Sequence, residues 1–176
     1  DNMKSGLRSF QKYVPADLVR RLMARGVDAE IGGTQQEVTI FMSDIEGFTA
    51  LSERLAPVDL IRHLAEYLTA VTDCLLDTDA TVDKYIGDAV LAFWNAPEPA
   101  ADHALRACRA ALESQKHIAA LNARWKAEGR PVAFKTRIGI NSAEVIVTNI
   151  GSSDLMSYTI IGDQVNLVSR LEAANK

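Results

Sequence analysis

Two short apolar runs, residues 81–86 and 89–94, are separated by only two residues, Gly87 and Asp88. This spacing is typical of a β-hairpin with a two-residue turn, in which glycine can adopt the positive φ needed at the first central position. The sequence therefore predicts a hairpin that holds Asp88 at its tip with an exposed carboxylate. Any fold for this chain must place these two antiparallel strands among segments with helical patterns.

A second aspartate, Asp44, follows a segment that favours a buried strand. Residues 37–42 are rich in β-branched and aromatic side chains, which pack well on a pleated sheet. Carboxylates at the ends of neighbouring strands, such as Asp44 and Asp88, can bind a hard divalent cation, which prefers oxygen ligands. Taken alone, each aspartate is more often a solvated turn residue, because aspartate is common in turns.

The composition is that of an ordinary soluble globular domain. The chain has 176 residues, of which 48% are hydrophobic and 24% charged, so one domain with a sizeable core is expected. A formal charge of −4 argues against a nucleic-acid partner. Cys74 and Cys108 show no metal-ligand spacing, and this cysteine usage suggests a reduced, cytoplasmic setting.

No segment of the sequence is long and apolar enough to span a bilayer, and no signal-peptide pattern is present. Because the chain ends inside a helical pattern at residues 165–174, we expect it to be part of a longer polypeptide. That polypeptide could be anchored to a membrane through another segment.

Residues 1–35 are interpreted as a connecting segment. Pro15 can start a short helix with an apolar stripe that ends at Gly26, and Gly32 and Gly33 are expected to break the chain before the first strand. This helix could pack on the domain or transmit a signal to it, and the sequence leaves both alternatives open.

The remaining residues, 36–176, show a β-α-α-β-β-α-β-β order that continues into a last helix. This order indicates an α+β fold in which helices cover a mainly antiparallel sheet. Asp163 is expected to be the N-cap of the last helix. Beyond the segments already named, helices are predicted around residues 48–55, from Pro57 to 75 and over 102–127, and strands over 134–140, 145–150 and 158–161.

Four segments together form a recognisable pattern, although none of them is decisive alone. They are residues 41–49, 84–88, 137–141 and 158–172. In this order and with this spacing, they resemble the two metal motifs, the central strand and the last helix of class III nucleotidyl cyclase catalytic domains. The resemblance covers residues 36–176, is of the adenylate cyclase type, and implies a regulatory domain in the same polypeptide. It implies a ferredoxin-like βααββαβ core that forms a head-to-tail homodimer, with nucleotide sites at the dimer interface.

The resemblance also implies a reaction, the conversion of ATP to 3′,5′-cyclic AMP and pyrophosphate. Asp44, Asp88 and the carbonyl of Ile45 would hold two metal ions, Mg²⁺ or Mn²⁺. One ion would lower the pKa of the ribose 3′-hydroxyl, and the other would bind the triphosphate and offset charge on the leaving group.

Two residues of the predicted last helix map onto the family's transition-state pair, which the partner protomer supplies. Asn166 would orient the ribose, and Arg170 would stabilise charge on the α-phosphate with its forked donors. Their i, i+4 spacing places both on one helix face, although without the resemblance each would be interpreted as a surface residue. The first motif further assigns substrate binding to Gly47, Phe48 and Thr49.

Lys84 and Thr159 map onto the positions that recognise the base. A lysine can donate to adenine N1, which is an acceptor, whereas guanine carries a donor at N1. Thr159 can hydrogen-bond to the exocyclic amine, so the pair favours ATP over GTP. Without the resemblance, Lys84 would be interpreted as a solvated strand residue, and Thr159 as a residue that favours a strand through its β-propensity.

Two departures from the family pattern keep alternatives open. Ala143 and Thr148 stand where many relatives have glycine, which could restrict backbone approach near the interface. The family usually continues with further strands and a phosphate-binding lysine, so the domain is expected to be incomplete at its C-terminus. The alternatives are a guanylate cyclase, which Lys84 argues against, and a catalytically silent dimerisation or nucleotide-sensing module. A polymerase-palm-like domain would use its aspartates similarly, but the acidic charge disfavours it.

Overall fold

The computed structural model describes residues 32–152 and 156–175. The short helix predicted between Pro15 and Gly26 lies outside the described residues. Within them, the chain folds as an α+β domain whose helices and strands follow the predicted order. The first strand begins at Gly32, four residues before the start of the domain predicted at residue 36.

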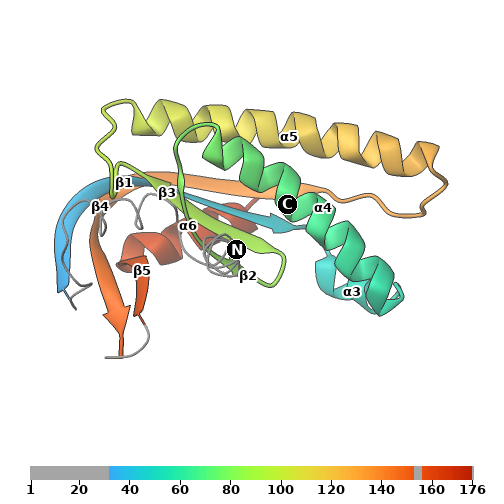
Figure 1. The fold of residues 1–176 in the computed structure, drawn as a ribbon, viewed down its shortest axis with the longest axis horizontal. Coiled ribbons are helices and arrows are strands. Elements are labelled where there is room, and N and C mark those ends of the chain that lie inside the picture. Colours follow the sequence, from blue (N-terminus) through green and yellow to red (C-terminus); the bar gives the residue numbers. More distant parts are fainter. Residues whose placement is uncertain (1–31, 153–155, 176) are drawn as a thin grey trace, which may run out of the picture.

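A five-stranded antiparallel sheet forms the centre of the domain (Figure 1). Its strands are β1 (Gly32–Ile45), β2 (Thr81–Ile86), β3 (Ala89–Trp94), β4 (Thr136–Gly151) and β5 (Met156–Ile161). They lie in the order β2-β3-β1-β4-β5, and each pairing among these described strands is antiparallel. β1 pairs with β4 along all of its 14 residues, so this pair is the longest in the sheet.

Helices cover both faces of this sheet (Figure 1). α4 (Pro57–Leu76) and α5 (His103–Ala127) pack together on one face, and α6 (Asp163–Ala173) packs on β1 and β4 from the other. The short α3 (Phe48–Ser52) follows closely after β1. Pro57 occupies the first turn of α4, as predicted. Among the residues that the structure describes, none of the helices has both the length and the apolar character required to cross a membrane.

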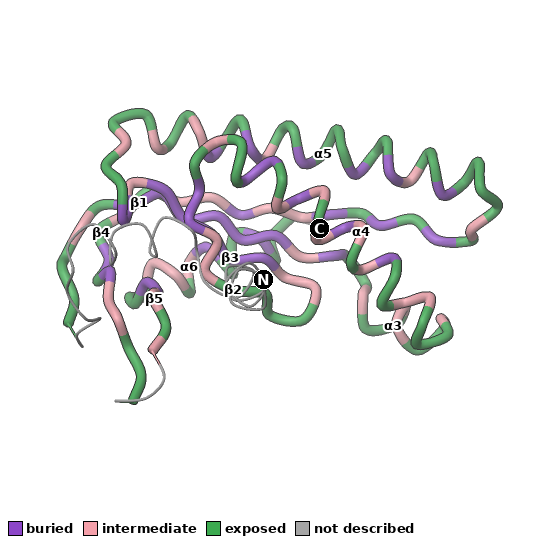
Figure 2. Tube along the Cα trace, in the orientation of Figure 1, coloured by how far each residue is buried: buried purple, intermediate pink, exposed green. Residues whose placement is uncertain are grey.

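The sheet separates two apolar cores, because successive strand residues point to opposite faces. Along β1, Val38, Ile40 and Met42 pack in the cluster that α6 covers, whereas Phe41 and Ile45 pack in the cluster under α4 and α5. Figure 2 shows buried positions along the central strands. Each large apolar side chain that is fully buried contributes about 2 kcal/mol. The end of β1 that carries Asp44 is therefore fixed by packing on both faces.

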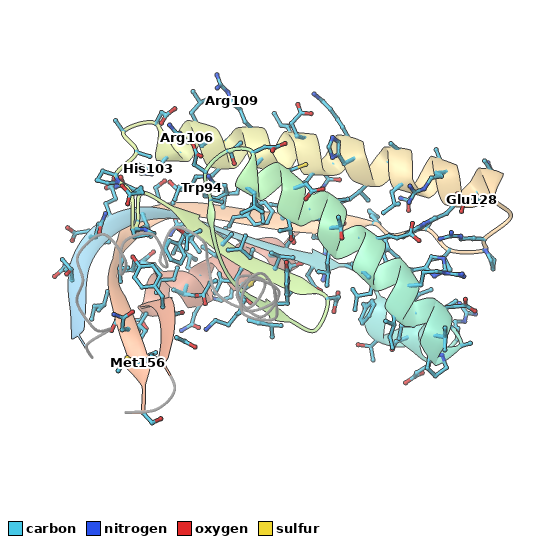
Figure 3. All side chains as sticks on the ribbon, in the orientation of Figure 1. Trp94, His103, Arg106, Arg109, Glu128 and Met156 are labelled. Atoms are coloured by element: carbon cyan, nitrogen blue, oxygen red, sulfur yellow. The ribbon has the colours of Figure 1, made fainter. Side chains whose placement is uncertain are left out.

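Helix α5 is held near both of its ends. At its start, His103 Nδ1 lies 2.6 Å from Thr39 Oγ1 of β1, and Figure 3 labels His103 at this end of the helix. Near its other end, the Asn122 side chain donates to the carbonyl of Phe134 and accepts from its N–H, at 2.7 and 2.9 Å. These contacts fix the start of α5 on β1 and its other end on the segment that leads into β4.

The hairpin has the predicted bounds, with Gly87 and Asp88 as its two-residue turn. Gly87 has a φ of 64°, in the left-handed region that favours glycine. The prediction of an exposed Asp88 carboxylate is wrong. Asp88 is only partly exposed, because the turn lies against the end of β1 and the carboxylate accepts a hydrogen bond from the Ile45 backbone.

A single strand replaces the two strands predicted over residues 134–140 and 145–150. β4 is continuous, although Asn141, Ser142 and Glu144 interrupt its apolar runs. Residues 141–144 pair with residues 37–40 of β1. Pairing with a long neighbouring strand therefore overrides the local signal for a break.

Two further local expectations are wrong. Gly32 and Gly33 do not break the chain, since both pair with β4 as part of β1. Asp163 is not the N-cap of α6, because Gly162 occupies that position and Asp163 is the first helical residue. The Asp163 carboxylate still lies in the first turn, where the helix dipole stabilises negative charge.

Candidate active site

Two carboxylates from different parts of the chain meet at the backbone of Ile45. Its N–H donates to Asp44 Oδ1 at 2.9 Å and to Asp88 Oδ2 at 2.9 Å. Asp44 lies at the end of β1 and Asp88 in the turn between β2 and β3, and β3 is the neighbour of β1 in the sheet. The structure therefore brings together the three residues predicted as metal ligands.

The electrostatics of this pair favour a bound cation. Burial, together with the neighbouring Asp44 carboxylate, raises the pKa of Asp88 to about 7. A divalent cation between two like charges would remove their repulsion, and carboxylate and carbonyl oxygens suit Mg²⁺ or Mn²⁺. Within the described ranges, no cluster of three or more His, Cys, Asp or Glu side chains is suited to a metal. The Ile45 carbonyl, water or substrate oxygens would therefore complete the coordination.

Arg137 is a further site residue, to which the sequence analysis assigns no role. Its Nη2 donates to Asp44 Oδ2 at 3.2 Å. Asp44 and Arg137 are directly opposite in the β1–β4 register, so their side chains project from the same face of the sheet. Arg137 belongs to the third family motif, but its partner becomes identifiable only when the two strands are paired.

The same arginine connects the aspartates to α6. Arg137 Nε lies 2.8 Å from Glu172 Oε1, a distance typical of an ion pair, although the alignment is poor for a hydrogen bond. Glu172 is 5% exposed, and burial raises the pKa of its carboxyl while the Arg137 charge lowers it. The position of α6 is thus coupled to the carboxylate pair through one buried ion pair.

Close backbone packing also fixes α6 on the sheet. A Cβ added to Gly139 of β4 would lie 2.5 Å from the carbonyl oxygen of Val168 and 2.7 Å from the backbone nitrogen of Glu172. Only glycine permits this approach without displacing the helix backbone. Gly139 therefore sets the distance between α6 and β4.

Helix α6 carries the predicted transition-state pair, Asn166 and Arg170, at exposed positions. Among the described residues, no hydrogen bond or ion pair joins either side chain to Asp44 or Asp88. One chain therefore does not bring together the two halves of the predicted site. This separation is the arrangement expected if the pair acts on a site of a second protomer.

The predicted base-recognition residues are in contact. Lys84 Nζ donates to Thr159 Oγ1 at 3.2 Å, although β2 and β5 form opposite edges of the sheet. The sheet curves at the end where β4 meets β5 (Figure 1), and the rings of Phe93 and Tyr158 lie 6.1 Å apart across β3 and β5. This curvature brings the outer strands together.

Asp83, which the sequence patterns did not single out, contacts both of these residues. Thr159 Oγ1 donates to Asp83 Oδ2 at 2.5 Å, and Lys84 Nζ lies 3.3 Å from Asp83 Oδ1. In the sequence, the only local signal for this contact is an acidic residue next to Lys84. Such a residue is indistinguishable from a solvated strand residue.

The remaining predicted substrate-binding residues lie at the start of α3, directly after β1. Gly47, with a φ of 70°, is the N-cap of α3, and Thr49 is exposed in its first turn. Phe48 packs partly against the core under α4 and α5. Gly47 and Thr49 therefore lie just beyond Asp44, whereas the Phe48 side chain contributes to the packing of that core.

The two departures from the family pattern cause no backbone strain. Ala143 and Thr148 both lie inside β4. Outside glycine, positive φ values in the described ranges occur only at Asp79 and Asn95. Thr148 Oγ1 moreover donates to the carbonyl of Gly32 at 2.8 Å, so the threonine side chain is accommodated by a contact of its own.

Comparison with known proteins places this geometry in a family. The family model of the adenylate and guanylate cyclase catalytic domain matches residues 32–176. Adenylate cyclase 1 of Rhizobium meliloti (strain 1021) is 36% identical over 173 residues, which are 98% of this chain and 26% of that relative. The chain belongs to this family of cyclase catalytic domains. It spans only 26% of the length of the curated relative.

Solved structures confirm the cyclase fold. The adenylyl cyclase CyaB from P. aeruginosa superposes with a TM-score of 0.79 at 37% identity, covering 82% of this chain and 75% of CyaB. The guanylyl cyclase Cya2 gives a TM-score of 0.77 at 36% identity, covering 81% and 72%. Because the two are almost equally similar, overall similarity does not decide between ATP and GTP.

Proposed function

We propose that this chain is the catalytic domain of an adenylate cyclase, which converts ATP to 3′,5′-cyclic AMP and pyrophosphate. The observation that carries this proposal is the 3.2 Å contact between Lys84 Nζ and Thr159 Oγ1. A cationic donor beside a hydroxyl complements the N1 acceptor and the exocyclic amine of adenine. Guanine would present an N1 donor to the lysine, so a guanylate cyclase is the weaker alternative.

The active sites would be shared in a head-to-tail homodimer. In support, Asn166 and Arg170 are exposed on α6 and, among the described residues, form no hydrogen bond or ion pair with the two aspartates of their own chain. Exposed apolar residues near both halves of the site would suit a partner surface. They are Tyr85 and Ile86 beside the hairpin turn, and Ile146, Ile150 and Ile161 on β4 and β5.

The carboxylate pair would hold the metal ions. Asp44, Asp88 and the Ile45 carbonyl would bind two Mg²⁺ or Mn²⁺ ions, which supply activation of the ribose 3′-hydroxyl and neutralisation of the leaving pyrophosphate. The Ile45 N–H orients both carboxylates, and the Arg137 hydrogen bond restricts that of Asp44. A restricted carboxylate pair loses little entropy when a cation binds.

The other residues would position the substrate for in-line displacement. The 3′-oxygen attacks the α-phosphorus, the bond to the oxygen bridging to the β-phosphate breaks, and the 3′-hydroxyl proton is released. Asn166 would orient the ribose, and Arg170 would donate to the α-phosphate oxygens on which charge develops. Lys84 and Thr159 would hold the base, which fixes the distance between the reacting atoms.

A catalytically silent module remains the alternative of another class. Each of the residues with a proposed role in the reaction is present, and Ala143 and Thr148 are accommodated without strain. These observations favour an active enzyme. A regulatory domain in the same polypeptide is a further proposal, supported by the greater length of the curated relative.

Product identification tests the proposed function. The full-length polypeptide is incubated separately with ATP and with GTP in the presence of Mn²⁺, and the products are separated by chromatography. Cyclic AMP from ATP is expected, with a rate that exceeds cyclic GMP formation by at least on the order of tenfold. Cyclic GMP as the main product would favour the guanylate cyclase, and no cyclic product would favour the silent module.

A further inference from the structure

A buried carboxylate, Asp83, lies behind the two residues proposed to recognise the base. Only 1% of its side-chain surface is exposed, compared with 44% for the neighbouring Lys84. The pairing of β2 with β3 shifts register between Val82 and Lys84, so Asp83 is the extra residue of a β-bulge. A bulge changes the regular alternation of side chains. Here it allows two consecutive residues to reach Thr159.

Two donors converge on the Asp83 carboxylate. The Thr159 hydroxyl donates to Oδ2 at 2.5 Å, and Lys84 Nζ lies 3.3 Å from Oδ1. Burial raises the pKa of Asp83, and the contacts with Thr159 and Lys84 oppose the rise. A hydroxyl donor on one oxygen and an ammonium beside the other match the ionised form, which only accepts hydrogen bonds.

This carboxylate decides the polarity of the Thr159 hydroxyl. A hydroxyl has a single proton and two acceptor lone pairs. Because the proton of Thr159 is directed to Asp83, the Thr159 oxygen can only accept from any other group. Lys84 Nζ occupies this acceptor position in the structure, at 3.2 Å. Thr159 is itself only 5% exposed, so a wrong partner could not be replaced by bulk water.

A hydroxyl of fixed polarity can distinguish two purines. The exocyclic 6-amino group of adenine is a donor, whereas the corresponding oxygen of guanine is an acceptor. An acceptor-only hydroxyl complements adenine and opposes guanine, while a hydroxyl free to rotate could serve either base. Sites whose buried polar groups face the wrong edge discriminate by on the order of 10⁴-fold.

We propose that Asp83 is a specificity-determining positioning residue, which makes the Thr159 hydroxyl an acceptor and holds the Lys84 ammonium beside it. The inference rests on the proposed adenylate cyclase function and adds a residue that acts on the base without touching it. Asp83 works through Thr159, and the bulge in β2 is the backbone feature that makes this possible.

The nucleotide preference of Asp83→Asn in the full-length dimeric enzyme tests the proposal. Asparagine keeps the size of the side chain, but its amide can donate to Thr159 as well as accept, so the hydroxyl polarity is no longer set. The ratio of kcat/KM for ATP to that for GTP should fall by on the order of tenfold. Asp73→Asn removes the same charge at an exposed position of α4 and should leave the ratio unchanged.

A double-mutant cycle with Thr159→Val separates specificity from structure. If Asp83 acts through the hydroxyl, Asp83→Asn should no longer change the ratio once the hydroxyl is absent. The proposal would be overturned if Asp83→Asn, in the protein that retains Thr159, lowered activity toward both nucleotides equally and left the ATP-to-GTP ratio unchanged. Asp83→Ala, which removes the acceptor altogether, should lower the ratio too.

Two other outcomes are distinguishable in the same experiment. Failure of both Asp83 variants to fold, judged by thermal unfolding, would assign Asp83 to the stability of the sheet and overturn the specificity role. A wild-type enzyme that prefers GTP would contradict the adenylate assignment itself, and this inference with it. An ATP preference in the wild type that Asp83→Asn does not alter would overturn only the inference.

Discussion

The Asp88 carboxylate accepts a hydrogen bond from the backbone N–H of Ile45 at 2.9 Å, although 43 residues separate the two in the sequence. The same N–H lies 2.9 Å from Asp44 Oδ1. This shared donor couples the hairpin to the end of β1, so a shift of either element would separate the two carboxylates. The proposed cation site thus depends on the register of the central sheet.

Removal of either carboxylate should abolish the reaction. Asp44→Ala or Asp88→Ala is expected to lower kcat at least on the order of 100-fold at saturating Mn²⁺, because both carboxylates are needed to hold two ions. Both side chains are partly exposed, so the fold should survive, as circular dichroism would show. Activity near the wild-type level in either variant would contradict the assignment of the metal ligands.

Asp88 should make the stability of the metal-free protein depend on pH. The pKa of its carboxyl rises from an ordinary 3.8 to about 7 in the folded protein. Between these values the unfolded chain has lost a proton that the folded chain retains, so the free energy of unfolding falls as the pH rises. Asp88→Asn cannot ionise and should escape this loss.

The measurement is the Tm of wild type and Asp88→Asn in a chelator, at about pH 5 and about pH 8. The Tm of the variant relative to wild type should be higher at the upper pH than at the lower one. The same Tm difference at both pH values would show that Asp88 retains an ordinary pKa.

Gly139 should be intolerant of any side chain. Gly139→Ala places a Cβ 2.5 Å from the Val168 carbonyl oxygen, so it should destabilise the domain by about 1–3 kcal/mol and displace α6. Gly32→Ala is the matched control, because a Cβ there has no neighbour within 4 Å. Equal free energies of unfolding for the two variants would contradict the close packing of α6 on β4.

Two inactive variants should restore each other if the site is shared. In a mixture of Asp44→Ala and Arg170→Ala, each heterodimer contains one site with an intact carboxylate pair and an intact arginine. Random pairing makes half of the dimers heterodimers, so activity should recover to about a quarter of the wild-type level. Absence of recovery, with heterodimers demonstrated by mass spectrometry, would argue that each site is built from a single chain.

Local patterns were sufficient to predict the hairpin and the long helices. The turn at Gly87 needs only neighbouring residues to form, and α4 begins at a proline whose position is favourable in any context. Asp44 and Asp88 were also identifiable, since each ends a strand that its own sequence defines. These features depend little on the rest of the chain.

Features that depend on distant partners could not be predicted in this way. Residues 141–144, three of which are polar, continue β4 only because β1 pairs beside them. The link from Arg137 to Glu172 requires α6 to be packed on the sheet, and the burial of Asp83 requires both a bulge and the curvature that brings β5 to β2. In the sequence, Arg137, Glu172 and Asp83 are indistinguishable from solvated charged residues.

The identity of the substrate depends most directly on Lys84. Lys84→Glu replaces a donor by an acceptor, which suits the N1–H and 2-amino group of guanine instead of adenine N1. The variant should lose at least on the order of tenfold in kcat/KM for ATP, about 1.4 kcal/mol of transition-state binding. Thr159→Cys in the same chain should add to this loss, and gain of GTP activity is a smaller expected effect, since rejecting one base is easier than accepting another.

The decisive measurement is kcat/KM for ATP and for GTP, in the wild type and in Lys84→Glu, with the full-length protein and Mn²⁺. Arg62→Glu, the same kind of charge reversal on the exposed side of α4, serves as the control. We expect a wild type that prefers ATP and a Lys84→Glu variant whose ATP-to-GTP ratio is at least about tenfold lower. An unchanged ratio would show that Lys84 is only a surface residue of the hairpin, and would contradict the assignment of ATP as the substrate.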